Sequence, residues 1–287
     1  MKRVPWILAL LGALLLNAAP VPAVDGFYVI PVGRPAVGTK ITSLPYTIWT
    51  PGYYYFTGNL SRGSGPGITI NADNVTLDLM GFALIGPADN NGFGIIWGTQ
   101  NNIEVRNGTL TGWSIGVKGD GGAHHRLINL RANGNTYGIW MNGDDVLIQG
   151  CTAAQGSFGS GWGLTIYNFT GAVTGCTVTG FTNNGIFIDA GKISGNVVQG
   201  CNGIGIYARS SATISYNTVS GCTIGISNFG GGSIIGNVVT ADTGQTGIVP
   251  SEGTAYANVL DQNTVSGAGT RYDTGSSATV WGLNAGK

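Results

Sequence analysis

The chain has 287 residues, of which only 9% are charged, and its formal net charge is zero. This composition argues against a nucleic-acid partner, because phosphate binding needs clustered Lys and Arg side chains. Hydrophobic residues make up 43% of the chain, which argues against disorder, and the 51 glycines follow no Gly-X-Y period, which excludes collagen.

Residues 1–23 have the pattern of a secretory signal peptide. Residues 1–3 carry two basic side chains, residues 4–16 are apolar, and Val21 and Ala23 are small residues at the −3 and −1 positions of a cleavage site. The apolar run is too short to span a bilayer comfortably and no second one follows, so we expect no transmembrane segment after cleavage. We therefore expect a protein that is secreted, periplasmic or held at the cell surface.

Residues 24–66 come next and lack the repeat that dominates the rest of the chain. They contain the turn Pro51-Gly52 and a group of aromatic residues, namely Tyr46, Tyr53, Tyr54, Tyr55 and Phe56. We expect this segment to form a small N-terminal β-cap that covers the exposed edge of the first repeat.

Residues 67–272 contain a repeat in which a glycine precedes an aliphatic residue every 20–27 positions. The steps begin at Gly67, Gly94, Gly116, Gly138, Gly163, Gly185, Gly205, Gly225 and Gly247. The runs between them are rich in Val, Ile and Thr, alternate in polarity over about four residues, and show no helical period. One such repeat cannot bury its own apolar side, so the repeats must stack. We predict an all-β parallel β-helix (β-solenoid) of about nine rungs, each with three short strands.

A second column of residues supports this register. It lies in the later half of each rung and consists of Asn107, Asn129, Cys151, Cys176, Asn196, Asn217, Asn237 and Asn263. An inward Asn at a tight turn can bond its own backbone and the amide of the next Asn, which satisfies groups that would otherwise be buried without partners. We therefore expect these residues to have a structural role.

The four cysteines and the C-terminal tail leave alternatives open. Cys151 and Cys176 fall in one column, and Cys201 and Cys222 in another, each pair on adjacent rungs. Stacked Cα atoms lie within reach of a disulfide, but parallel side chains also suit free thiols, and neither is favoured. Residues 273–287 leave the repeat and form either a C-terminal cap or a tail that contacts a partner.

The segments 67–86 and 101–112 resemble the opening rungs of right-handed parallel β-helix repeat proteins of the pectate-lyase-like superfamily, and in particular uncharacterised exported bacterial members. The resemblance covers roughly residues 40–270 and implies a right-handed coil. Because this superfamily includes lyases, hydrolases, epimerases, adhesins and proteins without catalysis, the resemblance implies no single function.

In pectate lyases, the strands that correspond to the Gly-Ile steps line the substrate cleft with their outer face. Side chains alternate across a strand, so the residues after each Ile face outward. These outward positions carry Trp140, Tyr167, Phe187, Tyr207 and Phe229, together with Asp189 and Arg209. The turn before this sheet adds Trp113, Phe158, Trp162 and Phe181. Aromatic rings with polar groups at their margins suit sugar rings, so we predict a polysaccharide-binding or cell-surface glycan-binding face.

A catalytic centre is less apparent. The best candidate set lies at and after the first strand on two adjacent rungs and consists of Lys118, Asp120, His124, His125, Asp144 and Asp145. The paired Asp144-Asp145 resembles the aspartates of polygalacturonases, and two carboxylates with a His could perform acid–base glycoside hydrolysis. Related lyases use calcium, but Asp120 and Asp189 are three rungs apart, ~14 Å, which is too far to share one ion. Calcium is therefore weakly supported, and no residue is assigned as a metal ligand.

Three functions follow from this pattern. The first is an exported protein that binds polysaccharide through the aromatic face, and the second is a polysaccharide lyase or glycoside hydrolase. The third is a structural or adhesive surface protein whose rungs stack end to end or against partners. As an alternative to glycan binding, a cap, a tail or a second subunit covers the aromatic face, because exposed apolar patches also mark interfaces.

Overall fold

The computed structural model describes residues 38–89, 91–157, 159–250, 258–267, 269–272 and 279–285. The chain divides into residues 1–37 and a unit of residues 38–287, and all described residues belong to the second unit. The predicted signal peptide, residues 24–37 of the predicted cap, Phe158 and residues 273–278 therefore lie outside the described residues.

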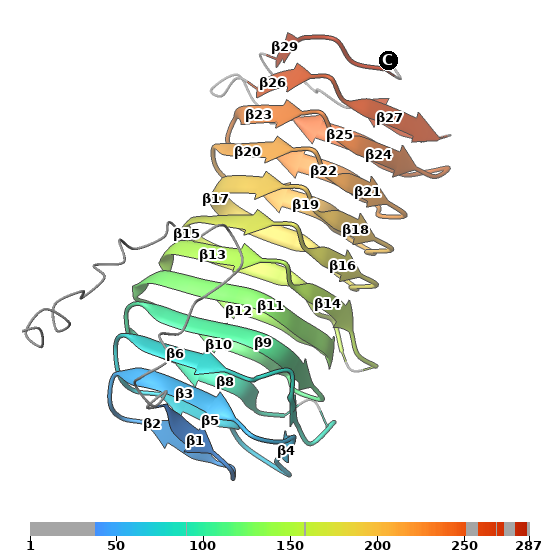
Figure 1. The fold of residues 1–287 in the computed structure, drawn as a ribbon. Coiled ribbons are helices and arrows are strands. Elements are labelled where there is room, and N and C mark those ends of the chain that lie inside the picture. Colours follow the sequence, from blue (N-terminus) through green and yellow to red (C-terminus); the bar gives the residue numbers. More distant parts are fainter. Residues whose placement is uncertain are drawn as a thin grey trace, which may run out of the picture. The chain divides into compact units, whose positions relative to one another are not determined.

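The described unit is a coil of short strands that stack into three parallel sheets (Figure 1). The first sheet contains β2 (Tyr46–Ile48), β5 (Ile68–Ile70), β8 (Phe93–Trp97), β10 (Ile115–Gly119), β12 (Tyr137–Met141), the first parts of β15 (Leu164–Thr174) and β17 (Ile186–Ser194), β19 (Ile204–Ala208), β22 (Ile224–Asn228), β25 (Thr246–Pro250) and β28 (Thr270–Tyr272). The second contains β1 (Thr39–Ile41), β3 (Gly52–Phe56), β6 (Val75–Asp78), the first parts of β9 (Ile103–Thr111) and β11 (Ala123–Asn135), β13 (Asp144–Gln149), the later parts of β15 and β17, β20 (Ala212–Ser215), β23 (Gly232–Ile235), β26 (Asn258–Asp261) and β29 (Thr279–Trp281). The third contains β4 (Leu60–Ser61), β7 (Ala83–Ile85), the later parts of β9 and β11, β14 (Thr152–Gln155), β16 (Thr177–Thr179), β18 (Val197–Gln199), β21 (Thr218–Ser220), β24 (Val238–Ala241) and β27 (Thr264–Gly267).

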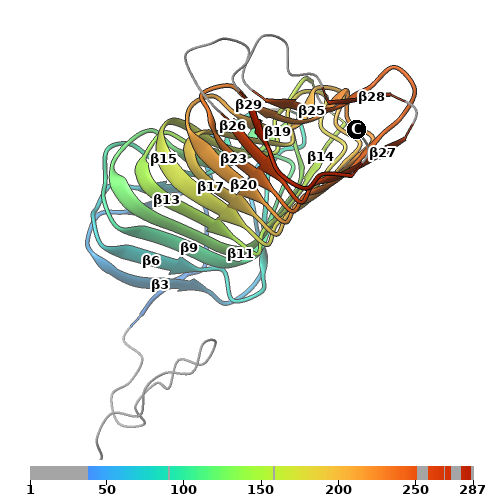
Figure 2. The same cartoon turned by 90° about the horizontal axis from the view of Figure 1, so that it is seen from above.

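Each strand pairs in parallel with strands one turn away, as in the pairings of β10 with β8 and β12. Seen along the stack, the strands of the second sheet lie side by side in chain order (Figure 2). These pairings give about ten turns and confirm the predicted parallel β-helix. No helix in the described ranges is both long and apolar enough to cross a membrane.

The described part of the predicted N-terminal cap is itself a turn of the β-helix. Strands β2, β3 and β4 pair in parallel with β5, β6 and β7, respectively. Tyr46 aligns with Ile68, so Pro45 occupies the position that Gly67 has in the next turn. The repeat begins earlier than residue 67, and the missing glycine concealed this first turn. At the other end, β29 pairs with β26, and Ala285 bridges Thr264, so the described part of the tail continues the stack.

The glycines that open the repeats lie where the main chains of adjacent turns approach each other closely. A Cβ atom at Gly94 would lie 2.5 Å from the carbonyl oxygen of Gly116, and a Cβ at Gly163 would lie 2.3 Å from that of Gly185. At these positions a Cβ would point along the stack at the backbone of the next turn, which is only about 4.8 Å away, so a side chain does not fit there. The recurring glycine is therefore explained by a close approach of main chains.

The aliphatic residue after each glycine points inward, as predicted. In the nine turns that carry the Gly-aliphatic step, this residue has none of its surface exposed. The column consists of Ile68, Ile95, Val117, Ile139, Leu164, Ile186, Ile206, Ile226 and Ile248. Burying one such side chain contributes about 1.5–3 kcal/mol, so this column is a large part of the core.

The later turns are joined by a chain of buried side-chain amides, the Asn ladder, formed by Asn196, Asn217, Asn237, Asn263 and Asn284. Each Nδ2 donates to the Oδ1 of the Asn in the next turn at 2.9–3.1 Å. The second Nδ2 hydrogen goes to a backbone carbonyl, and each Oδ1 of the next Asn also accepts a backbone N–H. The ladder therefore satisfies every polar group it buries.

Asn107 and Asn129 do not belong to this column, which corrects the sequence-based alignment. Arg131 pairs with Thr152, so Leu130 is the residue that aligns with Cys151. Asn107 and Asn129 lie one position earlier and have φ values of 57° and 54°. They occupy the left-handed turn position, where Asn is tolerated better than most residues.

The four cysteines are buried free thiols stacked in the predicted pairs. Cys176 lies at the head of the Asn ladder, where its backbone N–H donates to Asn196 Oδ1 at 2.8 Å. In the other pair, the Cys201 N–H points to the Cys222 sulfur at 3.4 Å. Contact with the neighbouring thiol, together with burial, raises the pKa of Cys151 and of Cys201, so these thiols stay protonated.

His125 is a core residue, although it was predicted as a catalytic candidate after the first strand. It aligns with Ile103 and Val146 in the inward column of the second sheet and has no exposed surface. Its Nδ1 accepts the Ile103 N–H at 3.4 Å, and its Nε2 lies 3.0 Å from the Gly121 carbonyl oxygen. A neutral imidazole protonated on Nε2 satisfies both neighbours, since one needs an acceptor and the other a donor. Burial lowers the pKa of His125 below its usual value.

We expect Gly163→Ala to lower the free energy of unfolding by about 1–3 kcal/mol, because its Cβ would force the backbone of the next turn away. Chemical denaturation followed by circular dichroism measures this change. Gly58→Ala is the control, because nothing lies within 4 Å of a Cβ at that position. Equal destabilisation by both substitutions would contradict the close-approach explanation.

We also expect His125 to make stability fall with falling pH. Below about pH 6.5 the unfolded imidazole takes up a proton while the buried imidazole stays neutral, so protons favour the unfolded chain. The melting temperature of the wild type should therefore fall more between pH 7.5 and 5.5 than that of His125→Val. The variant should start from a lower melting temperature, because Gly121 and Ile103 lose their partner. Parallel pH curves for the two proteins would disprove this role.

Candidate functional site

Six aromatic side chains on the outer face of the first sheet are in contact with one another. We call Tyr137, Trp140, Trp162, Tyr167, Phe187 and Tyr207 the aromatic stripe. Neighbouring ring centres are 5.2–5.9 Å apart along the chain of contacts. The register places Trp140, Phe187 and Tyr207 at the same outward strand position, with Thr165 between the first two. The stripe therefore crosses four consecutive turns, from β12 to β19.

The structure brings together four of the five aromatic residues predicted to bind a ligand. Trp140, Tyr167 and Tyr207 are partly exposed, whereas Phe187 is 3% exposed because other rings cover it. Phe229 is 45% exposed on the following turn and lies beyond Tyr207, where the chain of ring contacts that forms the stripe ends among the described residues.

The aromatic residues of the turn before this sheet do not all lie beside the stripe, contrary to the prediction. Trp162 joins the stripe, but Trp113 and Phe181 are 1% and 0% exposed and belong to the core. Each follows a glycine in the left-handed conformation, Gly112 and Gly180, which turns the next side chain inward. The sequence did not predict Tyr137 in the stripe. It lies directly before the Gly138-Ile139 step, and strand alternation does not place a residue there on the outer face.

An Arg–Asp pair lies against the C-terminal end of the stripe. Arg209 Nη2 donates to Asp189 Oδ2 at 2.9 Å, Arg209 Nε lies 2.6 Å from Asp189 Oδ1, and the Asp189 side chain is only 8% exposed. The guanidinium carbon is 4.9 Å from the centre of the Tyr167 ring, and Nη1 lies 3.4 Å from the Tyr167 hydroxyl. Asp189 also accepts the backbone N–H of Asn168. The pair is thus fixed in place between β17 and the residue that follows β19.

A second ion pair lies at the other end of the stripe. Lys118 aligns with Trp140 on the preceding turn, and its Nζ is 2.7 Å from an oxygen of Asp120. The same Nζ lies 5.1 Å from the centre of the Phe93 ring. Lys118 and Asp120, which were candidates for catalysis, therefore neutralise each other beside the stripe.

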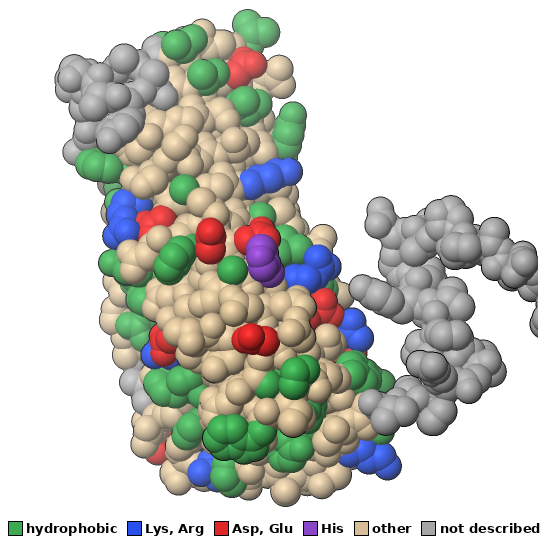
Figure 3. Space-filling view, turned by 90° about the vertical axis from the view of Figure 1, so that its left-hand side faces the viewer, with side chains coloured by type: hydrophobic (Ala, Val, Ile, Leu, Met, Phe, Trp, Pro, Cys, Tyr) green, Lys and Arg blue, Asp and Glu red, His purple; other side chains and the backbone are tan. Residues whose placement is uncertain are grey.

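The remaining catalytic candidates lie on the second sheet. His124 Nδ1 is 2.7 Å from an oxygen of Asp145, and both side chains are at least 70% exposed. Asp144 accepts a hydrogen bond from the Thr170 hydroxyl at 2.6 Å, which lowers the pKa of Asp144. Figure 3 shows a histidine side chain beside acidic side chains on the face that the view presents. The six predicted catalytic residues are thus divided between the first sheet, the second sheet and the core.

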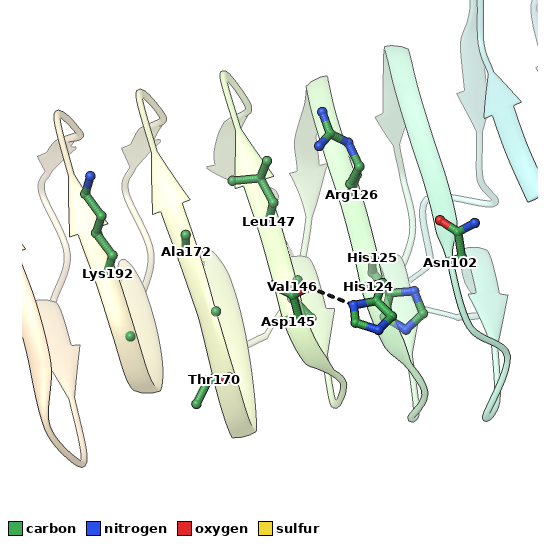
Figure 4. A pocket seen from close by; sticks show the side chains of 12 residues that line it. Asn102, His124, His125, Arg126, Asp145, Val146, Leu147, Thr170, Ala172 and Lys192 are labelled. Carbon is green, nitrogen blue, oxygen red and sulfur yellow. Dashed lines mark hydrogen bonds and ion pairs between the residues drawn. The ribbon is translucent and has the colours of Figure 1, made fainter. Parts of the chain in front are cut away.

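His124 and Asp145 border a hollow of about 620 Å³ on the second sheet. Figure 4 shows His124 directed toward Asp145, with Arg126 and Lys192 at opposite sides of the hollow. The lining residues are Asn102, His124, His125, Arg126, Asp145, Val146, Leu147, Thr170, Gly171, Ala172, Gly191 and Lys192. The surface is hollowed here because Gly171, Ala172 and Gly191 have little or no side chain, whereas the residues around them have longer ones.

The described residues contain no group of three or more His, Cys, Asp or Glu side chains placed to hold a metal ion. A calcium requirement and a catalytic role for the candidate set remain predictions.

Comparison with known proteins agrees with this architecture. A family model described as a right handed beta helix region matches residues 91–243, which is more than half of the chain. The Dettilon tailspike protein is a similar solved structure, with 15% sequence identity and a TM-score of 0.58 over 86% of this chain and 59% of that one. Another is the catalytic domain of a GH87 alpha-1,3-glucanase in complex with tetrasaccharides, with 11% identity and a TM-score of 0.47 over 88% and 61% of the two chains.

The chain therefore spans about three fifths of each of these two structures. No curated protein matches it. At these identities the similarity concerns the fold alone. The family match, the parallel strand register and the inward aliphatic column lead to one conclusion: the chain belongs to the right-handed β-helix family.

Proposed function

We propose that this protein binds polysaccharide through the aromatic stripe. The observation that carries the proposal is the unbroken contact of aromatic rings across four consecutive turns on the outer face of the first sheet. A column of this kind is not needed to close the core, because the inward column of the same strands is already filled by buried aliphatic residues.

The chemistry of the stripe suits sugars. Pyranose rings have apolar C–H faces and hydroxyl edges, and aromatic rings with polar groups at their margins complement both. Tyr167 and Tyr207 supply hydroxyl groups within the stripe, and the Arg209–Asp189 pair lies beside it. These groups can exchange hydrogen bonds with sugar hydroxyls while the rings cover the apolar faces.

The repeat of the β-helix also suits a polymer. Successive turns are about 4.8 Å apart, which is similar to the length of one sugar unit in an extended β-linked chain. A polysaccharide that lies parallel to the axis would therefore meet one aromatic position per turn. The signal-peptide pattern of residues 1–23 supports a site of action outside the cytoplasm, where such polymers occur.

A second candidate function is glycoside hydrolysis at the hollow of the second sheet. The observation that favours it is the contact between His124 and Asp145, since a carboxylate that orients an imidazole is a common arrangement in acid–base catalysis. This site is on another sheet from the stripe, so the two functions can be tested separately.

We expect Trp140→Ala to weaken binding of a β-linked oligosaccharide about 10-fold, which corresponds to the loss of about 1.4 kcal/mol from a central aromatic contact. Isothermal titration calorimetry measures the affinity. Trp49→Ala is the matched control, because Trp49 is 71% exposed and lies outside the stripe. His124→Ala should also leave the affinity unchanged.

The results that would redirect the proposal are distinct. If no saccharide in a broad panel binds, and light scattering shows a dimer that Trp140→Ala dissociates, the stripe is a self-association surface. If the wild type releases reducing ends from a polysaccharide and His124→Ala does not, the hollow of the second sheet is a hydrolytic site.

A further inference from the structure

The charged side chains beside the aromatic stripe pair with one another. Two outward columns of the first sheet run along the stripe, one through Trp140 and the other through Tyr167. Among their described positions, the charged residues are Lys118, Asp120, Asp189 and Arg209. They make two cations and two anions, so this face has no net charge.

Each cation is already paired with a carboxylate on the same face. Lys118 Nζ is 2.7 Å from Asp120, and Arg209 contacts both oxygens of Asp189. The other contacts of Arg209 are with the Tyr167 hydroxyl and the Asn168 side-chain oxygen, at 3.4 and 3.2 Å. The guanidinium group thus has little donor capacity left for an incoming ligand.

This pairing determines which sugars the face can accept. Recognition of a carboxylate or sulfate usually depends on an Arg or Lys that is free to form a charge-assisted hydrogen bond. An acidic sugar on the stripe would have to displace Asp189 or Asp120 from its partner, or lie close to these carboxylates. Sugar hydroxyls make no such demand, because they can donate to the carboxylates and accept from the remaining N–H groups.

We infer that the aromatic stripe selects neutral polysaccharides and rejects polyuronates and sulfated chains. This inference rests on the proposed function of the stripe. In the structure, Asp189 is the specificity-determining residue at one end, since its buried carboxylate holds Arg209 over the Tyr167 ring. At the other end, Asp120 has this role because its carboxylate pairs with Lys118.

The test compares two ligands of the same shape. One is a neutral β-linked gluco-oligosaccharide, and the other is the same oligosaccharide with its C6 carbons oxidised to carboxylates. Isothermal titration calorimetry at low salt should show at least 10-fold tighter binding of the neutral ligand by the wild type. Equal affinity, or a preference for the acidic ligand, would overturn the inference and leave the proposed function intact.

Removing one carboxylate should relax the selection. Asp189→Asn keeps the shape of the side chain but leaves the Arg209 charge uncompensated, so we expect affinity for the acidic oligosaccharide to rise at least 10-fold. This gain should disappear in high salt. Asp120→Asn tests the same effect at the Lys118 end and keeps the experiment decisive if Asp189→Asn does not fold.

Asp145→Asn is the matched control, because it removes one negative charge from the second sheet and not from the stripe. It should not change the ratio of the two affinities. If Asp145→Asn raises acidic binding as much as the stripe variants do, net charge and not the paired set determines selection, and the inference is wrong. If the wild type binds neither ligand nor any other saccharide, both the inference and the proposed function fail.

Discussion

The parallel hydrogen bonding of each turn to the next is the constraint on which the other features depend. It holds successive backbones about 4.8 Å apart, so each side chain lies directly over its counterpart one turn away. At the glycine column this spacing leaves no room for a Cβ, as the 2.3 Å approach at Gly163 shows. Wherever there is room, like residues stack on like, which produces the aliphatic column, the Asn ladder and the paired thiols of Cys151 and Cys176.

The same constraint explains why the outer faces differ. On the first sheet it places aromatic rings and oppositely charged groups on neighbouring turns, so that rings pack together and Arg209 reaches Asp189. On the second sheet small residues at Gly171 and Ala172 follow longer ones, and the stack opens into a hollow instead. One face therefore offers a continuous apolar surface without net charge, and the other a polar depression bordered by Arg126 and Lys192.

Stacking also gives His125 a structural role in a column of buried aliphatic residues. His125 occupies a column that Ile103 and Val146 fill on adjacent turns, and the imidazole is tolerated there because one nitrogen accepts and the other donates. Its neighbour His124 points outward and contacts Asp145. Two consecutive histidines thus have unrelated environments, since alternation across the strand separates them.

The sequence by itself determined the period of the repeat, the parallel β-helix, the inward aliphatic column and most of the aromatic stripe. These features follow from the spacing of Gly-Ile steps and from alternation within a strand, and both are local properties of the chain. Tertiary structure decided what happens where the alternation is interrupted. Asn107 and Asn129 have left-handed backbone conformations at a turn and so lie outside the ladder column, whereas the left-handed Gly112 and Gly180 turn the side chains that follow them, Trp113 and Phe181, into the core. The first turn, which has Pro45 in place of glycine, became recognisable only through its pairing with the next one, because a register between strands cannot be read from one strand alone.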